Sequence, residues 1–102
     1  MSKIMIMTTL KLKNENEVDA WKVMSRKIDN DLEGADGFIS RDSVRRDDGL
    51  IYCILKWESK EQQEKFMANL AARTDIASTM MMENFSQIVD VDSMTKETFE
   101  VL

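Results

Sequence analysis

The side chains that could take part in chemistry are few in this chain of 102 residues, because it contains no histidine and only one cysteine, Cys53. Without histidine, the commonest general base and the commonest metal ligand are both missing. Serine–histidine and cysteine–histidine nucleophile pairs are excluded for the same reason, as are haem, zinc and iron sites that histidine would hold. A single cysteine forms no intramolecular disulfide. We therefore expect no metal site.

The remaining polar candidates are two arginines and a tyrosine. Arg41 and Arg45 share one face of a predicted strand with Ser43, and an arginine there could pair with a phenolate or a carboxylate and lower its pKa. The alternative is a solvated position or an ion pair with a nearby aspartate. Tyr52 carries a hydroxyl group on an otherwise apolar segment, where it would bond to a ligand or to a structural partner.

Flexible apolar side chains are concentrated in the predicted helices. The chain has nine methionines, and the richest group of them consists of Met24, Met67, Met80, Met81 and Met82, together with Phe85. Thioethers line adaptable apolar pockets, and they fill cores equally well. Cys53 lies between apolar neighbours, so we expect burial to raise the pKa of its thiol and make it a poor nucleophile.

The elements that must position these residues follow from period-two and three-to-four spacing of apolar residues. We expect a strand over 3–13, a helix from Asn14 or Asn16 to Gly34, strands over 38–46 and 50–57, helices over 59–71 and 74–90, and a last strand over 95–102. A hairpin joins the middle strands, and residues 90–93 form a polar connection. This order predicts a single α+β domain over 1–102 with the ferredoxin-like split β-α-β arrangement, in which an antiparallel sheet has its helices on one face.

Two of these strands are apolar on both faces. Residues 50–55 carry no charged side chain, and Met5 and Met7 alternate with Ile4 and Ile6 in the first strand. Helices on one face of the sheet leave the other face uncovered. A second subunit that lays its own sheet there is the simplest cover, so we expect a homodimer. The alternative is a central strand that is buried only at its ends.

The segment Trp57-Glu58-Ser59-Lys60-Glu61, which follows an apolar strand and opens a helix, resembles the antibiotic biosynthesis monooxygenase family of dimeric α/β barrels. Three further segments agree with the family in order along the chain: 33–38 before the second strand, 46–48 in the hairpin, and 98–101 in the closing strand. The resemblance implies a dimer in which two sheets form a barrel, with a substrate pocket in each subunit between sheet and helices.

The resemblance also implies an activity. Several family members oxidise polycyclic phenols or quinols with oxygen and no metal, flavin or haem, so the chain is expected to act on a small aromatic substrate as a monooxygenase without a cofactor. Trp57 corresponds to the family's tryptophan beside the substrate, and its alternative role is plain core packing. The candidate catalytic residues are Trp57 and Arg41, and the candidate substrate-binding residues are Trp21, Tyr52, Phe66, Met81 and Phe85.

Two other functions stay open. A non-catalytic ligand-binding or regulatory dimer of the same fold is the main alternative, because the chain has no convincing acid–base pair. Haem-degrading relatives carry a ligating histidine on the last helix and an asparagine on the first strand. This chain has no histidine and offers Thr8 and Thr9 on that strand, which disfavours haem degradation of that type. Haem binding through an unusual ligand, such as a methionine or Tyr52, is the second alternative.

Charge and hydropathy argue against nucleic-acid-binding, membrane-spanning and secreted proteins. The net charge is −5, from 14 basic and 19 acidic residues, whereas nucleic-acid binding depends on clustered cations. No run of about 18 apolar residues is present and the first residues lack a signal-peptide core, so we expect a cytoplasmic protein without membrane or nucleic-acid partners.

Overall fold

The computed structural model, which describes residues 2–102, contains one antiparallel sheet of four strands in the order β2-β3-β1-β4. The strands are β1 (Ile4–Leu12), β2 (Phe38–Arg45), β3 (Ile51–Trp57) and β4 (Val89–Glu100). A turn in which Gly49 N–H bonds to the Arg46 carbonyl connects β2 to β3. The first and third strands are central, so the apolar strands identified in the sequence form the middle of the sheet.

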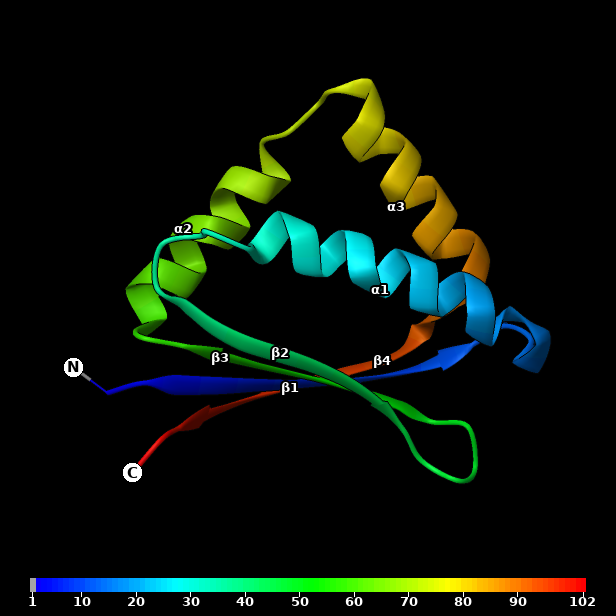
Figure 1. The fold of residues 1–102 in the computed structure, drawn as a ribbon, viewed down its shortest axis with the longest axis horizontal. Helices are drawn as coiled ribbons and strands as arrows, with labels where there is room; N and C mark the ends of the chain where they lie inside the picture. Colours follow the sequence, from blue (N-terminus) through cyan, green and yellow to red (C-terminus); the bar gives the residue numbers. More distant parts are fainter. Residues whose placement is uncertain (1) are drawn as a thin grey trace.

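The helices lie together over one face of the sheet (Figure 1). They are a short 3-10 turn η1 (Glu15–Glu17), α1 (Val18–Leu32), α2 (Lys60–Ala71) and α3 (Ile76–Ile88). Asn14, Ser59 and Asp75 each accept a backbone N–H at the start of η1, α2 and α3, as N-cap residues do. Half of the capping box expected at Ser59 and Gln62 is present: Ser59 Oγ accepts from the Gln62 backbone N–H, whereas the Gln62 side chain bonds to the Ser59 hydroxyl and not to its backbone N–H. Among residues 2–102, no helix combines the length and apolarity needed to cross a membrane.

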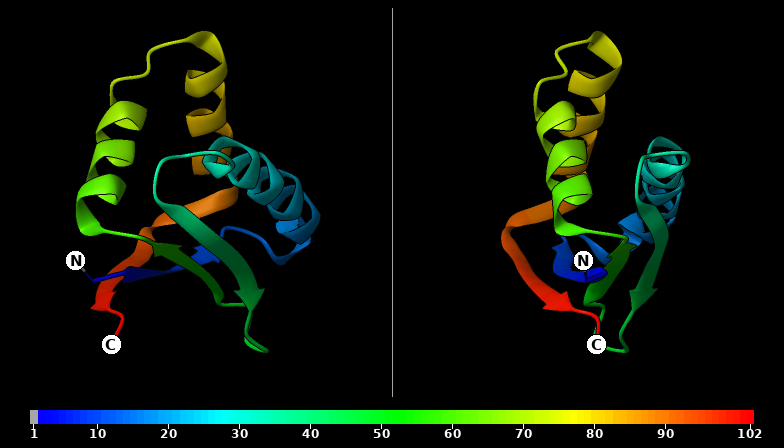
Figure 2. Two further views of the ribbon diagram at one scale, coloured as in Figure 1. Left: turned by 60° about the vertical axis from the view of Figure 1, so that its left-hand side comes forward. Right: turned by 90° about the vertical axis from the view of Figure 1, so that its left-hand side faces the viewer.

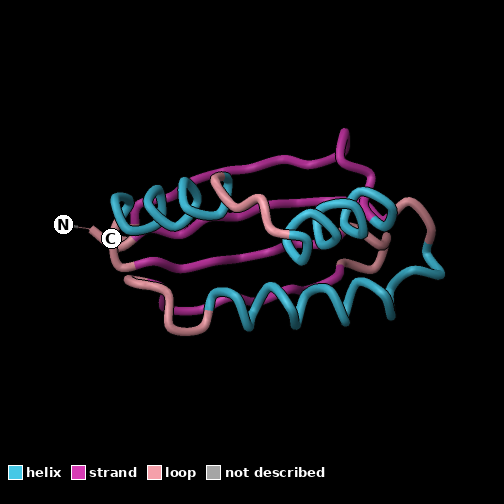
Figure 3. Tube along the Cα trace, turned by 90° about the horizontal axis from the view of Figure 1, so that it is seen from above, coloured by secondary structure: helices cyan, strands magenta, loops and turns pink. Residues whose placement is uncertain are grey.

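The helix layer is divided into two parts. Seen from above, α1 runs along one side of the molecule, and α2 followed by α3 runs along the other (Figure 3). The turned views show α1 above β2, while α2 and α3 rise away from the sheet and are joined by a loop at their far ends (Figure 2). This architecture confirms the predicted α+β ferredoxin-like fold.

The core fills the space between the sheet and the helices in two clusters. One contains Leu10, Ile51 and Val89 from the strands with Trp21 and Met24 from α1. The other consists of Ile4, Ile6, Leu32 and Trp57. Burial of these apolar side chains is the main stabilising term for a domain of this size.

The opposite face of the sheet carries no helix. The register places Met7 of β1 between Ile54 of β3 and Glu97 of β4, and places Tyr52 of β3 beside Thr9 of β1. The side chains of Met7, Ile54 and Tyr52 stay only partly buried, because nothing in the protomer covers them. We call this surface the open sheet face; its members are Met5, Met7, Thr9, Ser40, Asp42, Val44, Tyr52, Ile54, Lys56, Thr95, Glu97 and Phe99.

The last strand differs from its prediction. The sequence indicated a polar connection over 90–93 and a strand from 95, whereas β4 begins at Val89, directly after α3. Its first residues pair with the end of β1, where Lys11 lies opposite Asp90 and Leu12 opposite Val89. A register shift follows in β1 between Thr9 and Lys11. The polar residues were wrongly taken as a loop because β4 is an edge strand, where exposed polar side chains are tolerated.

Gly37 gives the first testable prediction. Its φ is 82°, and a Cβ at this position would run into the side chain of Gln62, whereas Gly34 has a similar φ of 80° and open space around it. Each Gly→Ala change places a Cβ on a residue with a positive φ, which lowers the free energy of unfolding by about 1–2 kcal/mol. We expect Gly37→Ala to cost about 1 kcal/mol more than Gly34→Ala in urea unfolding, because of the added clash. In a Gln62→Gly background, which removes every side-chain atom that the new methyl group would meet, the two losses should become equal, and a persistent difference would contradict the clash.

Candidate functional site

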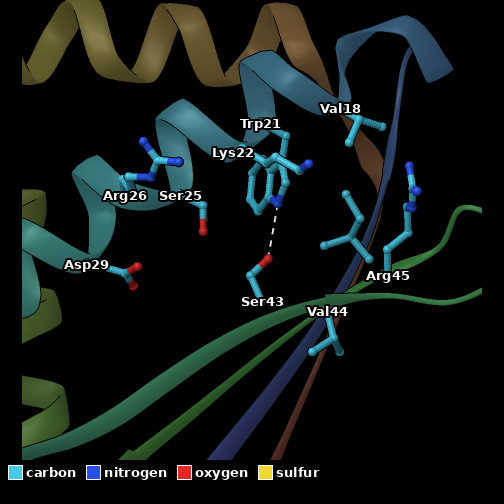
Figure 4. Close-up of a pocket in the computed structure, with 10 residues that line it drawn as sticks. Val18, Trp21, Lys22, Ser25, Arg26, Asp29, Ser43, Val44 and Arg45 are labelled. Atoms are coloured by element: carbon cyan, nitrogen blue, oxygen red, sulfur yellow. Dashed lines mark hydrogen bonds between the residues drawn. The ribbon is translucent and has the colours of Figure 1, made fainter.

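A pocket of about 440 Å³ lies between α1 and β2 (Figure 4). Ten residues line it: Val18, Trp21, Lys22, Ser25, Arg26, Asp29, Ser43, Val44, Arg45 and Ile51. Ligand pockets for small molecules have about this size, roughly 300–1,000 Å³. Because α1 carries six of the ten residues and β2 carries three, the packing of that helix over the edge strand creates the pocket.

Trp21 forms the aromatic wall of this pocket. The spacing of apolar residues in α1 turns Trp21 towards the sheet, and it is 4% exposed. Its indole Nε1 donates a hydrogen bond to Ser43 Oγ at 3.1 Å, and Phe85 of α3 meets its ring edge-on at a centroid distance of 6.2 Å. Since an indole N–H only donates, Ser43 is the acceptor and its own hydroxyl proton is left over. Ser43 can therefore donate to a ligand.

Arg41 lies behind the wall of the pocket. Its side chain is 4% exposed, and Nη1 donates to the backbone oxygen of Ser25 at 3.2 Å, to Ser25 Oγ at 2.7 Å and to Asp29 Oδ1 at 2.8 Å. Asp29 is half-exposed. The guanidinium thus ties β2 to α1 and neutralises the carboxylate at the pocket. Arg41 was predicted to meet the substrate directly; here it holds two residues of the pocket lining, Ser25 and Asp29, in place.

We expect Arg41→Met to lower the free energy of unfolding by about 2–3 kcal/mol, because hydrogen bonds to a charged group are each worth roughly 1.5–3 kcal/mol and Asp29 can regain water. Urea unfolding followed by circular dichroism measures the loss. Arg45→Met is the matched control on the same strand and face, since Arg45 is exposed. A loss no larger than that of the control would contradict a structural role for the Arg41 network.

Cys53 lies beneath the same region. Burial raises the pKa of its thiol, and the nearby Arg41 guanidinium and Ser43 hydroxyl offset part of that rise. Arg41 Nη2 is 3.7 Å from Cys53 Sγ. The expected burial and raised pKa of Cys53 are therefore confirmed, and its poor nucleophilicity stays a prediction.

Trp57 lies in the other core cluster. It is 1% exposed and packs between Phe38 and Phe66, at ring centroid distances of 5.5 Å and 5.4 Å. Its indole Nε1 is buried, and no hydrogen-bond partner for it occurs among residues 2–102. Trp57 and Phe66 thus contact each other, but neither lines the pocket between α1 and β2.

The other predicted site residues lie on different surfaces. Phe85 reaches Trp21 from α3, and Met81 is partly buried on the same helix. Tyr52 belongs to the open sheet face, on the side away from Trp57, and its hydroxyl receives a hydrogen bond from Arg46 Nη1 at 3.2 Å. The predicted residues therefore form a Trp21–Phe85 pair, a Trp57–Phe66 pair and a separate tyrosine.

Two cations on α1, Lys22 and Arg26, were not among the predicted site residues. Lys22 and Arg26 line the pocket, and they are one helical turn apart. Lys22 follows Val18 by four residues and is the next residue after Trp21, so the sequence already indicated that these two cations lie on or beside the helix face that carries Val18 and Trp21. The pairing of Arg41 with Asp29 gave no such signal, because it depends on how α1 crosses β2.

Two further observations limit the site. No group of three or more His, Cys, Asp or Glu side chains that could hold a metal is found in the part of the chain that the structure describes. A second pocket, about 600 Å³, lies where Ile4, Ser59 and Phe99 meet at one end of the sheet, and it contains none of the predicted residues. The pocket between α1 and β2 is the better candidate, since it combines an aromatic wall, cations and free hydroxyl donors.

Comparison with known proteins identifies the fold. No protein-family model and no curated protein sequence matches this chain. Among solved structures, SnoaB of Streptomyces nogalater, a cofactor-independent oxygenase, is similar at a TM-score of 0.75 and 8% identity, over 100% of this chain and 95% of that one.

Two other solved structures agree with this fold. A Nitrosomonas europaea protein provisionally assigned as an antibiotic biosynthesis monooxygenase has a TM-score of 0.77 at 8% identity, over 99% of this chain and 91% of that one. A dimeric ferredoxin-like protein from an uncultured marine organism has a TM-score of 0.74 at 15% identity, over 100% and 90%. The chain thus has a ferredoxin-like fold that monooxygenase-type proteins and a dimeric protein share.

Proposed function

We propose that this chain is an enzyme that oxidises an electron-rich phenol or quinol with molecular oxygen and without a cofactor, in the pocket between α1 and β2. The observation that carries the proposal is the match along the entire chain to the fold of a cofactor-independent oxygenase, combined with a pocket that has a buried aromatic wall. A volume of about 440 Å³ accommodates a flat bicyclic phenol.

The chemistry needs little from the protein beyond binding and deprotonation. A phenolate is electron-rich enough to pass an electron to oxygen, and the two radicals then join at the carbon para to the oxygen. Loss of water from the resulting hydroperoxide gives a quinone. One oxygen atom becomes the new carbonyl, the other leaves as water, and the phenol loses two hydrogens. The chain's own residues would contact the ring through the small accessible part of Trp21, donate to its oxygen (Ser43) and favour the phenolate by charge.

The test is oxygen uptake by the purified, chelator-treated protein with a panel of phenols, hydroquinones and 1-naphthol. Uptake should saturate with substrate. Val18→Trp should abolish it by filling the pocket, whereas Val23→Trp should not, because Val23 is exposed on the same helix and lies outside the lining. No uptake across the panel, or equal loss in both variants, would contradict the proposal.

The second candidate is a non-catalytic ligand-binding dimer. The pocket favours it in one respect, because its single lining carboxylate, Asp29, is already paired with Arg41 and leaves no acid–base pair. Thermal-shift screening separates the two candidates, since a ligand that binds the folded state raises the melting temperature by mass action. A compound that raises the melting temperature but is never oxidised favours the binding protein.

We also propose that the functional unit is a homodimer joined through the open sheet face. Met7, Ile54 and Tyr52 form an apolar centre there, and Asp42, Lys56 and Glu97 provide charges of both signs around it. Stacked sheets pack about 10 Å apart face to face. A second copy of the same face would cover side chains that the protomer leaves partly exposed.

We propose that Phe85, with Met81 on the same helix, supports the pocket wall, and that Trp57 and Phe66, which do not line the pocket, act on the site through the packing of β3 against α2. Phe85 holds Trp21 from behind, and Trp57 with Phe66 fixes the end of β3 against α2. A direct role for Trp57 would use its unpartnered indole N–H. The variant Trp57→Phe tests that role separately from packing, because it removes the indole N–H and keeps an aromatic ring.

A further inference from the structure

The pocket between α1 and β2 is strongly cationic for a protein with a net charge of −5. Lys22 and Arg26 line it from α1, and Arg45 lines it from β2. Figure 4 shows the Lys22 side chain extending along α1 towards the end of the pocket where Arg45 lies. None of the three forms an ion pair with another of residues 2–102. The cations are therefore available to a ligand.

The only acidic residue in the lining does not cancel this charge. Asp29 is bound by Arg41 at 2.8 Å, so the pair is neutral and three positive charges remain. One phenolate would use a single charge. The surplus points to a ligand that carries a permanent negative group as well as its phenol.

The neutral parts of the lining select the rest of the ligand. Trp21, Val18 and Ile51 offer apolar contact to a flat ring, and Ser43 has a hydroxyl proton to donate because its oxygen accepts from Trp21. Arginine and lysine together suit a carboxylate, which accepts two parallel hydrogen bonds from a guanidinium.

We propose that this pocket binds an aromatic carboxylate, and that the substrate of the oxidation is a phenol bearing a carboxylate. The ring lies against Trp21, and the carboxylate lies between the cations of α1 and Arg45. The statement about the substrate rests on the proposed function, whereas the binding of the carboxylate does not require turnover.

The experiment is titration calorimetry of the full chain with 5-hydroxy-2-naphthoate, whose ring carbon para to the hydroxyl carries a hydrogen, and with its neutral amide, 5-hydroxy-2-naphthamide. The acid should bind about tenfold more tightly than the amide at 20 mM salt, and the preference should shrink at 300 mM salt because ions screen exposed charges. Equal affinities, or no binding of the acid at millimolar concentration, would overturn the proposal.

Matched variants assign the preference to the pocket. Lys22→Met and Arg45→Met should each weaken binding of the acid several-fold and leave binding of the amide within twofold. Lys27→Met is the control, because Lys27 is an exposed cation on the same helix outside the lining. Equal weakening by Lys27→Met and Lys22→Met would show a general effect of net charge and overturn the site.

Oxygen uptake with the hydroxynaphthoate and with neutral naphthols is measured in parallel with the titrations. Charge-selective binding without oxygen uptake would leave this inference standing and remove the proposed function. Oxygen uptake with neutral naphthols and no preference for the acid would do the reverse.

Discussion

Replacing Ile54 with lysine is expected to split the proposed homodimer into monomers. Ile54 lies at the centre of the open sheet face, with Asp42 of β2 and Met7 of β1 as its cross-strand neighbours. In the isolated protomer the new ammonium would remain in water opposite the Asp42 carboxylate. Between two sheets it would be buried, and we expect the dissociation constant to rise at least a hundredfold, about 3 kcal/mol. Size-exclusion chromatography with light scattering at micromolar concentration measures the change.

Val23→Lys is the matched control for this prediction. Val23 is 53% exposed on α1, so the same change in charge and size occurs away from the open sheet face. It should leave the dimer intact. A wild-type chain that elutes as a monomer, or an Ile54→Lys variant that remains a dimer, would mean that the open sheet face does not join two copies.

Truncating Trp57 to alanine is expected to cost about 3–5 kcal/mol, the largest stability loss we expect from any side chain in the fold. Trp57 is 1% exposed, and it contacts Phe38 and Phe66, so a large cavity would remain between β3 and α2. Domains of this size have a total stability of about 5–15 kcal/mol, and the variant should therefore be partly unfolded near 37 °C. Thermal unfolding followed by circular dichroism tests this directly.

Trp57→Phe separates packing from chemistry. Phenylalanine keeps an aromatic ring and removes an indole N–H that has no partner among the described residues, so the stability loss should stay below that of the alanine variant. If Trp57 also orients the substrate, Trp57→Phe should lower the turnover number while the melting temperature changes little. A rate that falls only in proportion to the folded fraction would leave Trp57 as a core residue alone.

Much of the fold was predictable because its signals are local. Alternating apolar residues identified β1 and β3, and the Ser59 and Asp75 caps lie where α2 and α3 begin. The raised pKa of Cys53 also followed from its apolar neighbours. The start of β4 was missed because Asp90 and Asp92 resemble a loop, and only the pairing with β1 shows that they belong to an edge strand.

The candidate site was predictable only in part, because it depends on contacts between distant segments. Trp21 and Ser43 were each noted in the sequence, but their hydrogen bond requires α1 to cross β2. The ion pair of Arg41 with Asp29 depends on the same crossing. In the structure Arg41 contacts Ser25 and Asp29 and does not itself line the pocket, and its role towards a substrate stays a prediction.

The most direct test of the proposed function is the stoichiometry of oxygen consumption with 1-naphthol as substrate, measured on chelator-treated protein with an oxygen electrode and by chromatography of the product. A cofactor-independent monooxygenase should form one 1,4-naphthoquinone for each oxygen molecule consumed, without accumulation of hydrogen peroxide, and the Val18→Trp variant should not react. Absence of the quinone, or oxygen consumption that yields hydrogen peroxide in equal amount, would contradict a cofactor-independent monooxygenase.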